Sequence, residues 1–319
     1  MDLLFLGTSS GTPTQQRNVT GLALIEENSS AWYLVDCGEA TQHRLLQSPL
    51  SVNDLQAVFI THVHGDHCYG LPGLLASAGM LGRKQPLPVI APAGIEGWIE
   101  STRRLTQLHL PFELQFIATE TLADWRHRNW RVDAVELSHR VPSFAYCFTE
   151  ASVEPSLDTE RLKQHGLPQG PLWGQLKKGR DVSHDGRIFR SSDFVSQLHA
   201  PRRVVVAGDN DRPELLADAC RGAQVLVHES TYTEDVAAKV GPGVGHSAAA
   251  WVARFAQSAA LPHLLLTHFS ARYGSDASQS PSIEDVRQEA QAHYGGRLFL
   301  AEDHARYRLN RAGHLDRLA

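Results

Sequence analysis

The sequence has few cysteines, and none of them are paired at a metal-binding spacing. Cys37, Cys68, Cys147 and Cys220 are its four cysteines, and no two of them form a C-x-x-C pair. This argues against a zinc site built from paired thiolates and against a small fold stapled by disulfides. We expect reduced thiols and a cytoplasmic protein.

Long apolar segments and an excess of positive charge are also absent. No run of eighteen apolar residues occurs, and no basic leader precedes the apolar run at residues 3–6. These features predict a soluble protein that is neither exported nor held in a membrane. The net charge of −5 gives no overall basic surface, so contact with a nucleic acid would require a local basic cluster.

Composition and periodicity favour an α/β fold. With 42% hydrophobic and 20% charged residues over 319 positions, the chain can fill one large domain or two medium ones. Strand-like and helix-like runs alternate along most of it. The expected strands cover residues 2–6, 20–26, 31–36, 57–61, 87–91, 114–117, 130–137, 144–149, 202–207, 224–228, 263–267 and 297–301. The expected helices cover residues 41–46, 71–81, 94–107, 247–259 and 281–293.

The most informative segment is T-H-V-H-G-D-H, which follows an apolar strand-like run. Alternation in a strand places His62 and His64 on one face, and the turn at Gly65 brings Asp66 and His67 to a neighbouring point. Three imidazoles and a carboxylate so close together suit metal binding, and one segment can serve two adjacent ions. The alternative, solvated loop histidines, would be a chance match in a chain with 17 histidines.

Four further positions carry polar groups where apolar strands end, which is where open α/β sheets usually present their chemistry. They are His139, Asp209, His228 with Glu229, and His268. A single histidine at a strand end is more often a hydrogen-bonded structural residue than a ligand. The strong histidine motif nevertheless favours a functional interpretation for these positions as a group.

The pattern weakens over residues 151–195, where proline, glycine and charged residues predominate, and we interpret this segment as an insertion. Residues 160–190 carry seven basic and three acidic residues, a charge of +4 in a chain of −5. The segment is either a basic binding arm or a solvated loop with Trp173 and Leu176 packed on the body. The charge count does not separate these two alternatives.

Together these motifs resemble the metallo-β-lactamase superfamily and, within it, the ribonuclease Z (tRNase Z) branch of tRNA 3′-processing endonucleases. The matching segments are F-L-G-T-S-S-G-T-P-T, D-C-G-E-A-T-Q, T-H-V-H-G-D-H, S-H-R-V-P-S-F-A-Y, the arm with its G-P pair, A-G-D-N, H-E-S-T, G-H-S and T-H-F-S-A-R-Y. The resemblance covers nearly the whole chain. It implies a single domain over residues 1–319 with an αββα sandwich of two mixed β-sheets flanked by helices, and a flexible tRNA-binding arm inserted at 151–195.

The resemblance also implies a centre of two zinc ions per subunit, for which manganese is a possible substitute. One zinc would be held by His62, His64 and His139, the other by Asp66, His67 and His268, with Asp209 bridging them. Neutral imidazoles and carboxylates suit zinc, and the absence of thiolates leaves positions open for water and a phosphate oxygen. Asp36 and Asp303 either orient ligand imidazoles or merely cap turns.

The implied reaction is hydrolysis of precursor tRNA, which leaves a 3′-hydroxyl on the tRNA and a 5′-phosphate on the trailer. Asp66 corresponds to the proton acceptor that is proposed in the family for the attacking water. His246, paired with Glu229, would donate a proton to the departing 3′-oxygen.

Substrate contacts are expected in two places. In this family the arm grips the tRNA elbow across a homodimer, so that the arm of one subunit serves the active site of the other, and basic side chains neutralise phosphates without reading bases. The corresponding arm residues are Gly170, Pro171, Lys177, Lys178 and Arg180. The residues that match those near the scissile phosphate are Ser270, Arg272 and Tyr273, which are alternatively simple capping contacts.

Two alternative functions stay open at this point. One is another dinuclear phosphodiesterase or hydrolase of the superfamily that acts on a small substrate, because relatives cleave different bonds with similar metal cores. The other is a silent RNA-binding module that keeps zinc for stability. The complete ligand set with Glu229 and His246 argues against the second, since a structural zinc site is closed by four ligands. One departure from the family pattern is Asn210, where many relatives have threonine.

Overall fold

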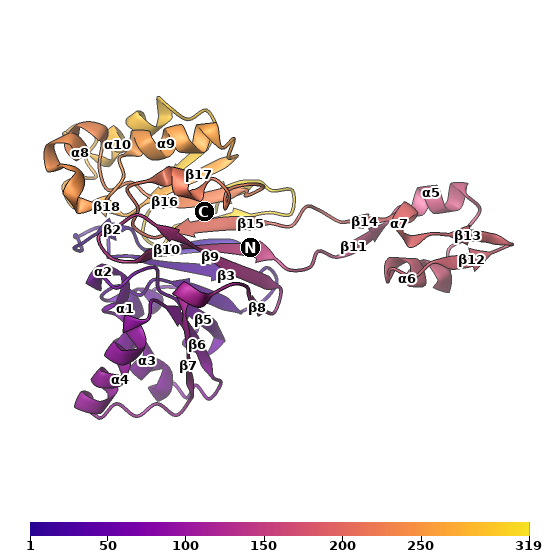
Figure 1. Ribbon diagram of the computed structural model, residues 1–319, viewed down its shortest axis with the longest axis horizontal. Helices are drawn as coiled ribbons and strands as arrows, with labels where there is room; N and C mark the ends of the chain where they lie inside the picture. The colour runs from indigo at the N-terminus through magenta and orange to yellow at the C-terminus, as the bar shows by residue number, and fades with distance from the viewer. Residues whose placement is uncertain (319) are drawn as a thin grey trace.

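The computed structural model describes residues 1–318. Its body consists of two large mixed β-sheets packed face to face, with helices on both outer faces (Figure 1). This is the αββα sandwich that the family resemblance implies. A narrow projection, the arm, extends from one end of the body. Within residues 1–318, no helix is both long and apolar enough to cross a membrane.

The first sheet has eight strands in the order β21-β20-β1-β3-β4-β5-β6-β7. They are β1 (Asp2–Gly7), β3 (Gly21–Ile25), β4 (Trp32–Val35), β5 (Leu55–Phe59), β6 (Leu87–Ala91), β7 (Leu114–Ala118), β20 (Arg306–Leu309) and β21 (Leu315–Arg317). Strands β4 to β7 run parallel. The helices between them cover the outer face of the sheet and are α1 (Thr41–Leu45), α3 (Leu71–Met80) and α4 (Gly94–Thr106).

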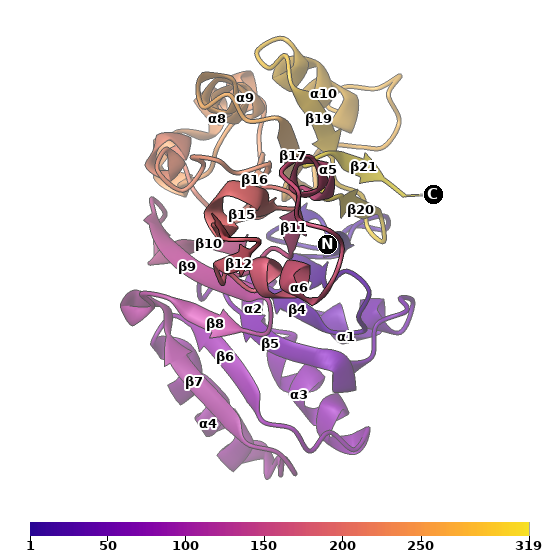
Figure 2. The same cartoon turned by 90° about the vertical axis from the view of Figure 1, so that its right-hand side faces the viewer.

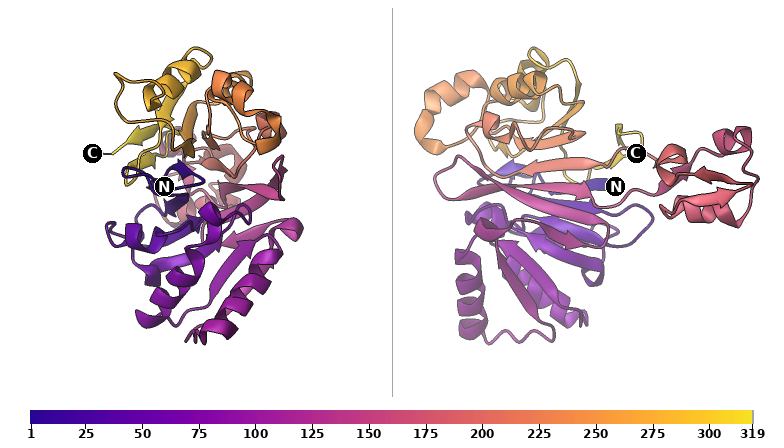
Figure 3. Two further views of the ribbon diagram at one scale, coloured as in Figure 1. Left: turned by 90° about the vertical axis from the view of Figure 1, so that its left-hand side faces the viewer. Right: turned by 45° about the vertical axis from the view of Figure 1, so that its right-hand side comes forward.

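The second sheet has seven strands in the order β19-β17-β16-β15-β10-β9-β8. They are β8 (Trp125–His127), β9 (Trp130–Leu137), β10 (Ser143–Glu150), β15 (Arg203–Ala207), β16 (Val225–Glu229), β17 (His263–Thr267) and β19 (Arg297–Leu300). Strands β15, β16, β17 and β19 are parallel, and β8 to β10 form an antiparallel meander. Its outer face carries the orange and yellow helices of Figure 3, which are α8 (Glu234–Val240), α9 (Ala249–Ser258) and α10 (Ile283–Gln291).

Three apolar layers hold the four layers of structure together. Between the sheets, the Phe59 ring meets Tyr146 and Phe148 edge to face at centroid distances of 5.0 and 5.1 Å. One outer layer joins the first sheet to α3 and α4, and the other joins the second sheet to α9 and α10. Because both faces of each sheet are covered, central strands such as β17 are buried throughout and are not alternating.

The expected strands and helices of the body are all present, with ends that differ by at most two residues. The sequence pattern did not predict the C-terminal strands β20 and β21. In β20, buried Tyr307 and Leu309 alternate with Arg306 and Arg308, whose guanidinium groups bind the Asp2 carboxylate. Only one face of this short strand is apolar, so it lacks the continuous apolar run that marks the central strands.

The arm is folded rather than irregular. Strands β11 (Pro155–Leu157) and β14 (Val195–Gln197) pair antiparallel as its stalk. At its end lie α5 (Thr159–Gln164), α6 (Pro171–Lys177), β12 (Val182–His184), β13 (Arg187–Phe189) and α7 (Ser191–Phe194), which Figure 2 shows in front of the body. Trp173 and Leu176 belong to an apolar cluster made by arm residues alone. The alternative that these two side chains pack on the body is therefore wrong.

We predict that Trp173→Ala unfolds the arm and leaves the body intact. The indole is 8% exposed and its Nε1–H donates to Leu167 O at 3.3 Å. Removing a buried tryptophan costs about 3–5 kcal/mol, a large loss for so small a core. Hydrogen–deuterium exchange should show lost protection over 158–194 and unchanged protection in β1 and β16.

Ile188, which is exposed on strand β13 of the same arm, provides the control. Ile188→Ala should leave exchange unchanged throughout. Protection that persists in the arm of Trp173→Ala, or is lost in both sheets, would contradict the idea that the arm has its own core.

Candidate functional site

Seven imidazole and carboxylate side chains from both sheets converge at one edge of the sandwich. We call them the donor cluster: His62, His64, Asp66, His67, His139, Asp209 and His268. They follow strands β5, β9, β15 and β17, except that Asp66 and His67 lie in the short helix α2 (Gly65–Cys68) after β5. The structure thus brings together all seven residues that the sequence predicts as ligands, because the strand ends of both sheets meet at this edge.

The cluster divides into two groups, each able to hold one cation. The first group comprises His62, His64, His139 and Asp209. The second group comprises Asp66, His67 and His268. Within each group, the donor atoms all lie within 4.8 Å of one another.

The carboxylate of Asp209 lies between the two groups. Its Oδ2 is 3.5 Å from His62 Nε2 and 3.8 Å from His139 Nε2. Its Oδ1 is 3.5 Å from His67 Nε2 and 3.4 Å from His268 Nε2. Each oxygen therefore faces a different group, which is the arrangement that a carboxylate shared by two cations requires.

Two buried atoms show that the cluster fits cations. His62 Nε2 and Asp209 Oδ1 have no hydrogen-bond partner among residues 1–318. Leaving buried polar atoms unpaired is costly, and metal coordination is one way to satisfy them. Imidazole nitrogens with carboxylate oxygens suit Zn²⁺ and accept Mn²⁺. The residues present therefore fit a pair of divalent cations.

Hydrogen bonds on the outer side of the cluster orient its imidazoles. His67 Nδ1–H donates to Asp36 Oδ2 at 2.7 Å, and His139 Nδ1–H donates to the carbonyl oxygen of Gly245 at 2.7 Å. Each bond fixes the tautomer that leaves Nε2 free toward the cluster. Gly245 has a φ of +72°, and a Cβ at this position would lie 2.8 Å from His139 Nδ1. Glycine is required there.

Two threonine hydroxyls support two more imidazoles. Thr61 Oγ1 lies 3.1 Å from His62 Nδ1, and Thr231 Oγ1 lies 3.0 Å from His268 Nδ1. Thr231 also donates to Glu229 Oε2 at 2.6 Å. The two threonines occur in T-H-V-H-G-D-H and H-E-S-T. Sequence reasoning did not assign them a role, although both lie inside motifs it had singled out.

Asp303 contacts no imidazole of the donor cluster within the described part of the chain. Its carboxylate accepts hydrogen bonds from Thr8 Oγ1 and from the backbone N–H of Asn18 at 2.8 and 2.7 Å. It thereby fixes both ends of the loop at residues 8–18, whose Gly11 N–H donates to Asp66 Oδ2 at 2.7 Å. The prediction that Asp303 orients a ligand imidazole is wrong, whereas the same prediction for Asp36 agrees with its bond to His67.

His246 lies beside the cluster and is held by Glu229. Its Nδ1–H donates to Glu229 Oε1 at 3.2 Å and lies 3.6 Å from Asp209 Oδ2. Burial disfavours the charged imidazole, yet the Glu229 carboxylate raises the pKa of His246 to about 9. His246 is therefore protonated at neutral pH and can donate a proton. It could also reach a cation together with Asp209 and His268, but its bond to Glu229 favours the role of proton donor.

Carboxylates make the cluster strongly attractive to cations. Asp66 and Asp209 lie within it, Asp36 is hydrogen-bonded to its His67, and Glu229 is hydrogen-bonded to the adjoining His246. Burial opposes the ionisation of Asp66, but His67 and His268 hold its pKa well below the usual range. Asp66 is therefore ionised at neutral pH and can bind a cation or accept a proton.

A cavity of about 390 Å³ connects the donor cluster to solvent. Arg140, Tyr69 and Glu39 line it beside Asp66 and His246. The sequence analysis gave no role to Arg140, Tyr69 or Glu39. Arg140 nevertheless directly follows the predicted ligand His139 in S-H-R-V-P. The Arg140 guanidinium is a cation that an incoming phosphate group would meet in this cavity.

The residues predicted to lie near the scissile phosphate follow His268, and they differ in their exposure to solvent. Arg272 is exposed, its Nε–H donates to Ser270 Oγ at 3.1 Å, and its Cζ lies 5.1 Å from the Tyr232 ring centroid. Tyr273 is only 1% exposed, and its hydroxyl accepts a hydrogen bond from Thr233 N at 2.7 Å. Tyr273 therefore positions a loop, which agrees with the alternative that it makes a simple capping contact.

The arm residues predicted to bind substrate lie far from the cluster. The arm begins after β10, whose other end follows His139 closely. The seven steps between the eight residues of this strand, at about 3.4 Å each, span roughly 24 Å. Lys178 and Arg180 are exposed there, while Lys177 Nζ pairs with Glu154 Oε1 at 2.8 Å. Gly170 and Pro171 start helix α6.

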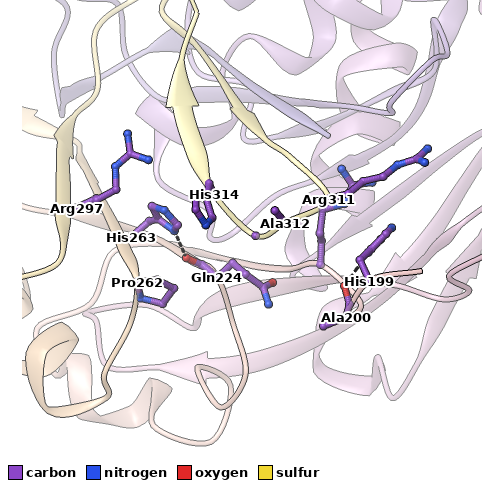
Figure 4. Close-up of a pocket in the computed structure, with 11 residues that line it drawn as sticks. His199, Ala200, Gln224, Pro262, His263, Arg297, Arg311, Ala312 and His314 are labelled. Atoms are coloured by element: carbon purple, nitrogen blue, oxygen red, sulfur yellow. Dashed lines mark hydrogen bonds between the residues drawn. The ribbon is translucent and has the colours of Figure 1, made fainter. Parts of the chain in front are cut away.

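A larger cavity, of about 630 Å³, lies elsewhere on the body (Figure 4). Its His263 uses both ring nitrogens, since Nδ1–H donates to Gln224 O at 2.8 Å and Nε2 accepts from Leu315 N at 3.1 Å. No cation-binding group occurs there within residues 1–318. Its arginines are all paired with carboxylates, in the pairs Arg202–Glu150, Arg297–Asp316 and Arg311–Glu27.

Comparison with known proteins finds relatives over the whole chain. The ribonuclease Z of Pseudomonas putida (strain GB-1) is 58% identical over 316 residues, which cover 99% of both chains. The ribonuclease Z of Marinobacter nauticus is 52% identical over 313 residues, covering 98% of this chain and 97% of the other. That of Brevibacillus brevis is 39% identical over 293 residues, covering 91% and 92%.

Solved structures and a family model add to this comparison. The crystal structure of human tRNase Z, short form, has a TM-score of 0.67 and 25% identity, covering 97% of this chain and 100% of the other. A metallo-β-lactamase fold protein of Bacillus subtilis, with a TM-score of 0.66, 19% identity and coverages of 96% and 98%, shows the shared fold. Residues 1–160 match the model of the family described as Anti-Pycsar protein Apyc1. That half lacks Asp209, His246 and His268, so the whole-chain relatives are the more informative.

We predict that Asp209→Ala lowers the metal content of the protein from about two ions to one or fewer, because both donor groups lose the carboxylate that faces them. The measurement is elemental analysis after dialysis against buffer with trace zinc. Glu39→Ala is the matched control, since this carboxylate lines the same cavity but belongs to neither group. Two ions retained in Asp209→Ala, or lost equally from Glu39→Ala, would contradict the prediction.

Proposed function

The chain belongs to the ribonuclease Z family, and we therefore propose that it is the endoribonuclease that removes the 3′ trailer from precursor tRNA. The observation that carries this proposal is the position of Asp209, with one oxygen toward each of two donor groups. We propose two zinc ions per subunit, with Mn²⁺ as a possible substitute. The products would be a tRNA with a 3′-hydroxyl and a trailer with a 5′-phosphate.

Two bound cations would supply an acidified water and would neutralise charge on the phosphodiester. The residues of the chain provide the proton acceptor. Asp66 is ionised at neutral pH and lines the cavity, and the N–H of Gly11 holds its Oδ2 in place at 2.7 Å. We assign to Asp66 both a place in the second donor group and the acceptance of a proton from the attacking water.

His246 is the proposed proton donor to the departing 3′-oxygen. Its Nδ1–H is committed to Glu229, so the proton on Nε2 is the one available to a substrate. Glu229 is buried and also accepts a hydrogen bond from Ser247 N at 2.8 Å, which fixes the direction of its carboxylate. Glu229 thus positions His246 and keeps it protonated.

We propose that the arm binds the body of the tRNA through the phosphate backbone. Lys178 and Arg180 are exposed on the arm, and Lys177 could exchange Glu154 for a phosphate. The arm leaves the body at the end remote from α2 and the donor cluster (Figure 1). A homodimer in which the arm of one subunit serves the active site of the other would reconcile these positions.

We also propose that residues 1–319 form one domain with residues 151–195 as its tRNA-binding exosite, and that the enzyme works in the cytoplasm. The four cysteines are buried free thiols, which suits a reducing compartment. A hydrolase acting only on small substrates would leave a folded, basic arm without a role. This is why we favour the tRNA-processing function over that alternative.

We predict that His246→Ala reduces kcat on precursor tRNA about 10²-fold or more, the usual contribution of a general acid. Hydrolysis of bis(p-nitrophenyl) phosphate should fall much less, because p-nitrophenolate departs without a proton. Zinc content, measured in parallel, should be unchanged. Glu229→Gln should give a smaller loss with the same dependence on the leaving group. Equal losses on the two substrates would remove His246 from the role of proton donor.

We predict that replacing residues 155–197 with a short Gly/Ser linker raises the KM for precursor tRNA at least about tenfold, because phosphate contacts supply much of the affinity for nucleic acids. Hydrolysis of bis(p-nitrophenyl) phosphate should be nearly unchanged. The double variant Lys178→Glu with Arg180→Glu keeps the arm folded and should also raise KM and weaken its salt dependence. Equal loss of both activities on deletion would indicate that the arm is structural only.

A further inference from the structure

We propose that a second cavity, adjoining the active-site cavity at His246, binds the nucleoside whose 3′-oxygen departs. This nucleoside is the last one retained by the tRNA, so the inference rests on the proposed function and deepens it. The second cavity has a volume of about 480 Å³ and lies among α8, α9 and the loop before α9. This volume falls within the range of about 300–1,000 Å³ that is usual for small-molecule sites.

The position of His246 links the two cavities. It lines the active-site cavity together with Asp66 and Asp209, and it also lines the second cavity. His246 lines both cavities, so in the proposed reaction the ribose that carries the departing 3′-oxygen would lie directly beside its imidazole. The second cavity begins at that point, so the attached base has this space within reach.

The lining of the second cavity has the chemistry that an unpaired base requires. Tyr232, Val244 and Trp251 contribute apolar and aromatic surface, and each is only partly buried. The Tyr232 ring packs edge to face against His246 at a centroid distance of 6.0 Å. Arg272 lies over the same tyrosine, with its Cζ 5.1 Å from the ring centroid. Proteins bind unpaired bases by stacking them on such aromatic and guanidinium groups.

One polar group in this lining has an unused acceptor. Asp211 Oδ1 is buried and has no hydrogen-bond partner among residues 1–318. The other charged groups there are engaged, since Arg212 pairs with Glu214 and Glu234 pairs with Arg254. Burying that oxygen without a donor is costly, and a turn of the Asp211 side chain toward the cavity would let an N–H of a base or the ribose 2′-hydroxyl satisfy it.

The loop between α8 and α9 joins this cavity to the metal centre. Pro242 and Val244, in the short helix η4 (Pro242–Val244), line the cavity, and the carbonyl oxygen of the next residue, Gly245, accepts the hydrogen bond from His139. An occupant of the cavity therefore contacts the loop that orients His139 and carries His246. Binding of the base should consequently affect kcat as well as KM.

The test fills the second cavity with a larger side chain at a position that has no proposed role in catalysis. Ala238, on α8, lines the cavity, and Ala238→Trp would occupy it. Lys239 is the next residue on the same helix, is exposed and does not line the cavity, so Lys239→Trp is the matched control. Precursor tRNA is compared with the same RNA made abasic at its last retained nucleotide and with bis(p-nitrophenyl) phosphate.

We expect Ala238→Trp to lower kcat/KM for precursor tRNA about 10- to 100-fold, the usual value of one stacked base. The wild-type protein should lose a similar factor on the abasic RNA, and the two losses should not add, because both remove the same contact. Hydrolysis of bis(p-nitrophenyl) phosphate should be unchanged in both variants, and Lys239→Trp should resemble the wild type throughout.

Normal cleavage of precursor tRNA by Ala238→Trp would overturn the inference while leaving the proposed function intact. Additive losses, an equal loss in Lys239→Trp, or a parallel loss on bis(p-nitrophenyl) phosphate would overturn it as well, since each implies an effect outside the cavity. Failure of the wild-type protein to cut any precursor tRNA would overturn the proposed function, and the inference with it.

Discussion

The constraint on which the rest of the structure depends is the packing of carboxylates and imidazoles at one edge of the sandwich. Asp209 is buried, and one of its oxygens has no hydrogen-bond partner among the described residues 1–318; Asp66 stays ionised although burial opposes its charge. Such an arrangement is stable only if cations balance it and if a rigid frame holds the groups together. The frame is visible in the backbone, since Asp36 and His268 have φ values of 61° and 58° that few side chains adopt. Packing on both faces of both sheets holds them there.

The same two sheets keep the donor cluster apart from the arm that we propose binds tRNA. Strands β10 and β15 pair antiparallel, and both connect the donor cluster to the base of the arm. Their near ends lead to His139 and Asp209, and their far ends lead to the stalk. The arm has its own apolar cluster, so it can bind a partner without altering the packing around the cations. This separation explains how a sandwich shared with a metallo-β-lactamase fold protein of low identity can act on a particular class of substrate.

A second level of recognition lies next to the chemistry. The loop that ends at Gly245 and His246 contributes a carbonyl to one predicted ligand, the predicted proton donor, and part of the wall of the adjoining cavity. A single loop would thus bear on the proposed metal geometry, the proposed protonation of the leaving group and the proposed contact with the retained nucleoside. Cavity size is therefore a poor guide to function in this protein, because the larger cavity lies away from the donor cluster and both ring nitrogens of its His263 are engaged.

The sequence by itself determined the features that are local in the chain. Periodicity located most of the body strands but not β8, β20 or β21. T-H-V-H-G-D-H identified a metal motif because four donors within six residues must be close in any fold. Only the tertiary structure decided the rest. His67 and His268 meet although 201 positions separate them, Asp303 holds a loop rather than an imidazole, Tyr273 is buried, and Trp173 packs within the arm. Burial and hydrogen-bond partners depend on which distant segments pack together, and local spacing carries no information about that.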